Sequence, residues 1–87
     1  MHAVVIHVTI NDREAATEAL RSEVVPQVSG APGFVAGYWV DVGEKHGVSV
    51  VAFESEDAAR AAADRAQTPG EFVTFDSVQV GEVVASA

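Results

Sequence analysis

The chain reads as one strand–helix–strand unit written twice, and this duplication restricts its fold more than any other feature. Within its 87 residues, the first unit spans residues 2–42 and the second spans residues 46–84. Two such units in succession give the order β-α-β-β-α-β, which is the split ferredoxin-like arrangement. The sequence therefore predicts an α+β fold, a four-stranded antiparallel sheet with two helices on one face, forming a single domain over residues 1–87.

The predicted strands follow from alternating apolar positions. They cover residues 2–10, 34–42, 48–53 and 72–84, with a polar hairpin loop at residues 43–47. The first of them has a wholly apolar face, and its other face is mixed. In the second, the period of two places five side chains on one face: Phe34, Ala36, Tyr38, Val40 and Val42.

The two helices are predicted at residues 11–25 and 55–66. Asn11 is expected to cap the first helix, and Pro26 is expected to end it at Val25, because a residue before proline is disfavoured in helical geometry. Ser55 is expected to cap the second helix, which residues 68–70 should close. The second helix has a smooth inner side of small residues: Ala58, Ala59, Ala62, Ala63 and Ala66.

The composition indicates a subunit interface. A chain of this length buries only about 60% of the surface that its unfolded form exposes. Yet 48% of the residues are hydrophobic, and there is no cysteine to form a disulfide or a thiolate metal site. This is more apolar material than two short helices can cover on one sheet, so a second subunit is expected on the other face.

The charge excludes several classes of partner. Thirteen acidic and five basic residues give a formal net charge of -8. Nucleic acids and anionic membrane surfaces are bound by clusters of lysine and arginine, and the sequence has none. No apolar run approaches the roughly 20 residues of a spanning helix, and no signal segment opens the chain. The expectation is a cytoplasmic protein with no nucleic-acid or membrane partner.

Two short stretches carry a resemblance to a known family. Residues 32–34, Pro-Gly-Phe, lead to Gly-Tyr-Trp at residues 37–39, and residues 53–59 read Phe-Glu-Ser-Glu-Asp-Ala-Ala. The chain thus resembles the dimeric α/β-barrel superfamily, and in particular its small antibiotic-biosynthesis-monooxygenase-like proteins. The resemblance implies a homodimer in which the two sheets pack face to face into a barrel.

His7 and Asp76 are the candidate catalytic residues. His7 is the only histidine well inside a predicted strand, and histidine is the side chain best suited to move a proton near neutral pH. Asp76 lies within the last strand, which neighbours the first strand in the ferredoxin-like order, so it could orient His7. The alternative is that His7 is a structural histidine in the core or the dimer interface and that Asp76 lies on a solvated edge.

The candidate substrate-binding residues are aromatic. They are Trp39, Tyr38, Phe53 and Phe75. Trp39 and Tyr38 should point to opposite faces of their strand, so that only one of them lines a given cavity unless the strand is bulged. The alternative for Trp39 is a large core or interface residue. No metal site is predicted, since His2 and His7 lie five apart on a strand and His46 falls in the hairpin loop.

The sequence departs from the haem-degrading members of the superfamily. The resemblance implies a ligand histidine and a tryptophan near the second helix and an asparagine in the first strand. Residues 55–72 contain neither His nor Trp, and residues 2–10 contain no Asn. The sequence therefore predicts that haem is not bound and that no cofactor is used.

Two hypotheses of function follow. The first is a homodimer that binds a small apolar or aromatic molecule and acts as a cofactor-independent monooxygenase, with His7 as base and Trp39 or Tyr38 as hydrogen-bond donor. The second is a non-catalytic binding or assembly module of the same fold. An open cavity lined by aromatic residues would favour ligand chemistry, and a sealed core would favour the module.

Overall fold

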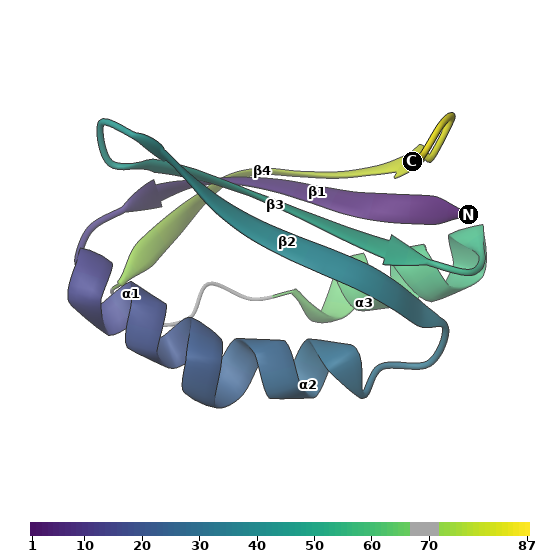
Figure 1. Cartoon of the computed structure of the whole chain (residues 1–87), viewed down its shortest axis with the longest axis horizontal. Helices are drawn as coiled ribbons and strands as arrows, with labels where there is room; N and C mark the ends of the chain where they lie inside the picture. Colours follow the sequence, from purple (N-terminus) through teal and green to yellow (C-terminus); the bar gives the residue numbers. More distant parts are fainter. Residues whose placement is uncertain (67–71) are drawn as a thin grey trace.

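The computed structural model describes residues 1–66 and 72–87 and confirms the predicted ferredoxin-like fold. Four antiparallel strands lie side by side in the order β2-β3-β1-β4, and the helices all lie on one face of the sheet (Figure 1). The strands are β1 (His2–Ile10), β2 (Phe34–Gly43), β3 (His46–Phe53) and β4 (Val73–Glu82). Within the described ranges, no helix has the length and apolar character needed to cross a bilayer.

The first helical region is longer than the sequence predicts. It consists of α1 (Arg13–Ala19), a π-helical turn η1 (Leu20–Val24) and α2 (Val25–Ser29). The expected end at Val25 is wrong, because Pro26 lies in the first turn of α2, where a missing N–H is tolerated. The Val25 N–H donates instead to the Leu20 carbonyl, five residues back, which gives η1 its wide turn.

Of the two predicted helix N-caps, one is correct and the other is wrong. The N-cap of α1 is Asp12, whose carboxylate accepts a hydrogen bond from the Ala15 N–H at 3.1 Å, and not Asn11. Ser55 caps α3 (Glu56–Arg65) as expected, through a 3.1 Å bond from the Ala58 N–H. The predicted closure of this helix at residues 68–70 lies outside the described residues.

Irregularities in the strands change which face some side chains occupy. The β2–β3 register shifts between Phe34 and Ala36, so Phe34 turns to the helix side and does not share the face of Ala36 and Tyr38, as the period of two predicted. The β1–β4 register shifts between His7 and Val8. The predicted five-residue hairpin loop is a two-residue turn, since β3 already begins at His46.

The compact part of the core lies between α3 and the sheet. Val4, Val51, Phe53 and Ala59 form a buried cluster, in which Phe53 is 1% and Ala59 0% exposed. Phe34 packs edge-to-face on Phe53, with ring centroids 6.3 Å apart. α3 approaches β1, β3 and β4 closely, and α2 approaches β2, whereas α1 and η1 stand farther from the sheet. The helical layer is therefore tightly packed at one end only.

Enlarging Ala59 should destabilise the fold. Ala59→Leu adds three carbons to a fully buried contact, and overpacking of this kind costs about 1–3 kcal/mol. Urea denaturation should show a lower midpoint than for the unmodified chain. Ala62→Leu, one turn away at a partly exposed position of the same helix, is the matched control and should cost less. Equal midpoints for the two variants would contradict the view that close packing is concentrated at Ala59.

Candidate functional site

A cavity of about 760 Å³ lies between the sheet and the first helical region. It forms where α1 and η1 stand away from the sheet, and Ala62 and Arg65 of α3 border it as well. Most of its walls are apolar, and the strands and η1–α2 contribute these branched side chains: Val4, Ile6, Val8, Ile10, Leu20, Val24, Val28 and Val51. The volume falls within the range of roughly 300–1,000 Å³ that is usual for small-molecule sites.

Three of the four predicted binding aromatics line this cavity. Trp39 comes from β2, Phe53 from β3 and Phe75 from β4. The strand register brings them to one face, because Trp39 lies opposite Ser49 and Phe75 lies opposite Val8. Aromatic rings from three strands therefore face the same space, as a planar apolar ligand requires.

Tyr38, the fourth predicted binding residue, points away from the cavity. It lies opposite Val50 on the face of the sheet that carries no helix, and it is 68% exposed. Trp39 and Tyr38 thus occupy opposite faces, as the alternation predicted. We call the helix-free side of the sheet the outer face.

Ser49 is a cavity residue that the sequence analysis did not single out. It is 8% exposed, it lies on the central strand β3 opposite both Trp39 and Ile6, and it borders the cavity. Its side chain has no hydrogen-bond partner among the described residues, so its hydroxyl is available to a ligand. The sequence does contain a signal for this residue. In the alternating series Gly47, Ser49, Val51 and Phe53, Ser49 is the one residue with a polar side chain.

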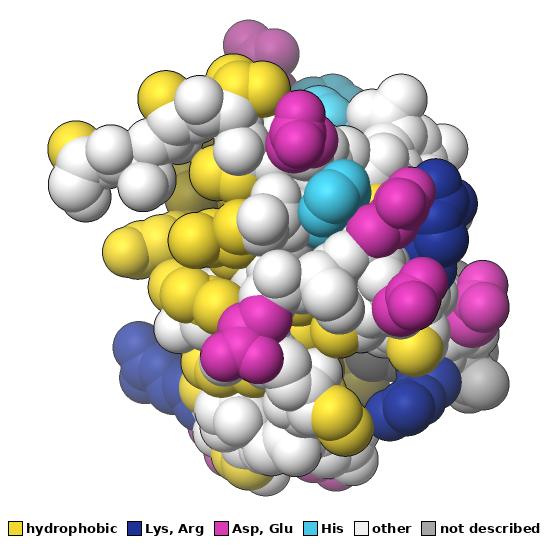
Figure 2. Space-filling model, turned by 90° about the vertical axis from the view of Figure 1, so that its right-hand side faces the viewer, with side chains coloured by type: hydrophobic (Ala, Val, Ile, Leu, Met, Phe, Trp, Pro, Cys, Tyr) yellow, Lys and Arg dark blue, Asp and Glu magenta, His cyan; other side chains and the backbone are white. Residues whose placement is uncertain are grey.

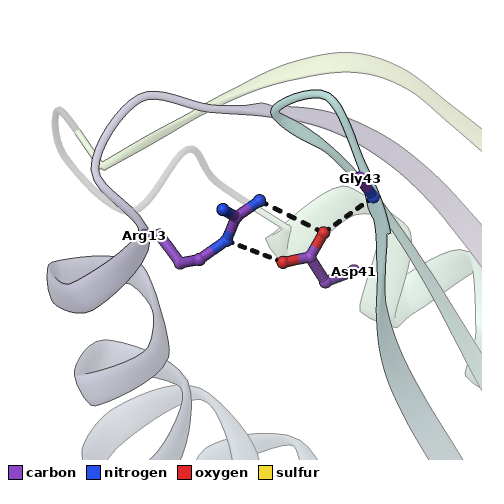
Figure 3. Close-up of polar contacts among 3 residues, drawn as sticks. All are labelled: Arg13, Asp41 and Gly43. Atoms are coloured by element: carbon purple, nitrogen blue, oxygen red, sulfur yellow. Dashed lines mark hydrogen bonds and ion pairs between the residues drawn. The ribbon is translucent and has the colours of Figure 1, made fainter.

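Two of the residues that line the cavity, Arg13 and Asp41, form an ion pair (Figure 3). The Arg13 Nε and Nη2 atoms lie 2.7 and 3.2 Å from the two carboxylate oxygens of Asp41, which joins the start of α1 to β2. The Asp41 carboxylate also accepts a hydrogen bond from the Gly43 N–H at 2.8 Å. The hydrogen bond from Gly43 and the Arg13 guanidinium hold the pKa of Asp41 below its usual range. Asp41 is therefore an ionised anchor and is poorly suited to be a base.

The two predicted catalytic residues lie on the outer face, away from the cavity. His7 lies between Val48 of β3 and Ser77 of β4, and its side chain is exposed. Asp76 falls at the register shift of β4, where its carboxylate accepts a 2.8 Å hydrogen bond from the Thr9 hydroxyl. Both side chains share one face, but that face is opposite the one that Trp39 lines.

The outer face also carries exposed apolar side chains. Val40 and Val42 of β2 are 50% and 59% exposed, and Val50 of β3 is 39% exposed. Figure 2 shows hydrophobic side chains gathered on the left of the view, with most carboxylates elsewhere. No metal-binding cluster of histidines and carboxylates occurs in the described ranges.

Comparison with known proteins identifies the fold. No protein-family model and no curated protein matches the chain. The chain is similar to the crystal structure of a mutant of MhuD with two manganese protoporphyrin IX bound per active site, at 20% identity and a TM-score of 0.69, covering 100% of this chain and 98% of that one. It is also similar to the heme-degrader MhuD from Mycobacterium tuberculosis with two hemes bound in its active site, at 23% identity and a TM-score of 0.54, covering 97% and 98%. The full-length likeness confirms the predicted fold class.

Removing Arg13 should raise the pKa of Asp41. In Arg13→Gln the ion pair is lost while the Gly43 N–H remains, so the pKa should rise but stay below that of an unstructured aspartate. Because the folded pKa is lowered, these contacts stabilise the fold above about pH 4 and are lost as the pH falls through the folded pKa. Carboxyl NMR titration of both proteins measures this. An identical pKa in the two would assign the whole effect to Gly43.

Proposed function

We propose that this chain binds a small, apolar, aromatic molecule in the cavity between its sheet and its first helical region. The observation that carries the proposal is the convergence of Trp39, Phe53 and Phe75 on one cavity, in which Ser49 supplies the one buried hydroxyl among the described lining residues. Ligand sites are commonly apolar clefts with a few polar groups that fix orientation. The neighbouring MhuD structures hold planar aromatic macrocycles in their active sites, which supports the same class of ligand.

Haem does not fit the residues of this cavity. Haem iron in proteins is held by His, Cys, Met or Tyr side chains. No residue of these types is among those that line the cavity in the described part of the chain, and residues 55–72 contain no histidine. The flat apolar walls suit a ring system, but nothing beside them would ligate the iron. We therefore propose a metal-free aromatic ligand and derive no step through haem.

Cofactor-independent oxygenation is the second candidate function. The Ser49 hydroxyl and the Trp39 indole N–H are the uncharged donors on the sheet side of the cavity that could stabilise an oxyanion. No histidine is among the described residues that line the cavity, Asp41 is tied to Arg13, and the other lining carboxylate, Glu23, is exposed on η1. Such a reaction would therefore need a substrate that enters already ionised. Simple binding is therefore the better supported function. His7, the predicted base, lies on the outer face and cannot reach a substrate in the cavity.

Binding can be measured with the neutral dye N-phenylnaphthylamine. Trp39 is the only tryptophan of the chain, so quenching of intrinsic fluorescence reports occupation of this cavity directly. We expect saturable binding that Trp39→Leu weakens by about tenfold, because the ring contact and its buried area are lost. Dye fluorescence gives the affinity of the variant, which lacks the intrinsic reporter.

Tyr38→Leu is the matched control, because it removes the neighbouring aromatic residue from the outer face. It should leave dye affinity unchanged. Equal losses in the two variants would contradict a cavity site, and absence of any saturable binding would remove the proposal. Hemin titrated in the same way should give no saturable Soret shift. Oxygen uptake with ionised phenols distinguishes the monooxygenase from the binding protein.

We also propose that the protein is a homodimer joined through the outer face. The supporting observations are the exposed valines of β2 and β3, Tyr38 at 68% exposure, and the fact that none of the described helices lies on this face. An apolar sheet face of this kind marks an interaction surface. His7 lies amid these side chains, so the dimer would enclose it, in agreement with a structural histidine at the interface.

Light scattering should therefore give about twice the chain mass of 9.1 kDa at micromolar concentration. Val50→Glu places a charge on the outer face and should shift the protein to the monomer, because an unpaired charge in an apolar interface is costly. Ser29→Glu adds the same charge at an exposed position of α2 and should remain dimeric. A monomer mass for the unmodified chain would contradict the proposal.

A further inference from the structure

We infer that the ligand of the cavity carries an acidic group, and that Arg21 and Arg65 bind this group at the mouth. This rests on the proposed function, and it narrows the ligand class from aromatic molecules in general to aromatic acids.

Three of the basic residues of this strongly acidic chain line the cavity. The sequence as a whole has five basic and thirteen acidic residues. Among the described residues that line the cavity the ratio is reversed, since three are arginines, Arg13, Arg21 and Arg65, and two are carboxylates, Asp41 and Glu23. In a chain with a formal charge of -8, these described lining residues thus carry a net positive charge. The field at the mouth favours an anion.

Two of these arginines have no ion-pair partner among the described residues. Arg13 is held by Asp41, and Arg60, which does not line the cavity, is held by Glu56 at 2.7 Å. Arg21 and Arg65 form no ion pair with any part of the chain that the structure describes. Among the described residues that line the cavity, Glu23 is the one carboxylate without an ion pair. A free guanidinium offers a planar fork of donors that matches a carboxylate or a sulfonate.

Their positions suit an amphipathic ligand. Arg21 comes from η1 and Arg65 from the last turn of α3, so the two arise from different walls of the cavity, and both are exposed. Trp39 and Phe75 lie on the sheet side, and both are half-buried. A ligand can therefore place its ring on the aromatic residues and leave its acid at the hydrated mouth, which avoids the cost of burying a charge.

The test compares two dyes that differ by a single acidic group. Anilinonaphthalene sulfonate is N-phenylnaphthylamine with a sulfonate added to the naphthalene ring. We expect the unmodified protein to bind the sulfonate dye more tightly. Arg21→Gln and Arg65→Gln should each weaken the sulfonate dye about five- to tenfold, as loss of a charge-assisted contact does, and change the neutral dye less than twofold.

Arg60→Gln is the matched control, because it removes the same charge from α3 outside the cavity. It should leave the affinities of both dyes unchanged. If both dyes bind equally and neither cavity variant separates them, the acidic-ligand inference is overturned while the aromatic site stands. An equal loss for Arg60→Gln would assign the effect to overall charge and would also overturn it. If neither dye binds, the proposed function fails, and this inference fails with it.

Discussion

The close contact between α3 and the sheet is the constraint on which the rest of the structure depends. Ala59 meets Phe53 and Val4 in a fully buried cluster, and the small alanine side chains let the helix approach the strands closely. The first helical region presents larger side chains there, such as Leu20 and Val24 of η1, and its α1 and η1 parts stand away from the sheet. Because α3 lies close to the sheet and α1 and η1 lie farther from it, a cavity remains between the sheet and the first helical region.

The two faces of the sheet have separate roles because strand side chains alternate. The helix face brings Trp39, Ser49 and Phe75 together around the cavity. The outer face brings His7 and Tyr38 together with exposed valines. In our proposals the first face holds a ligand and the second holds another copy of the chain. His7, which the sequence predicted to be catalytic, is therefore better explained as a residue of the proposed dimer interface.

Much of the fold could be predicted because it depends on local patterns. Alternation located the four strands, and Ser55 marked the start of α3. The predictions failed where a backbone irregularity intervened. Pro26 did not end its helix, since the π turn of η1 absorbs the missing N–H, and the register shift beside Phe34 turned that ring to the helix side. Neither irregularity changes the periodicity of apolar residues, so the pattern alone could not reveal it.

The sequence by itself determined the order of elements and the face on which Trp39 stands relative to Tyr38, because the period of a strand is fixed by backbone geometry. It also determined the absence of a histidine in residues 55–72. Only the tertiary structure decided that His7 and Asp76 lie opposite the cavity, that Ser49 borders it, and that Arg21 and Arg65 stand unpaired at its mouth. These facts depend on how far each helix stands from the sheet and on which strands pair, and both are set by contacts between residues distant in the chain.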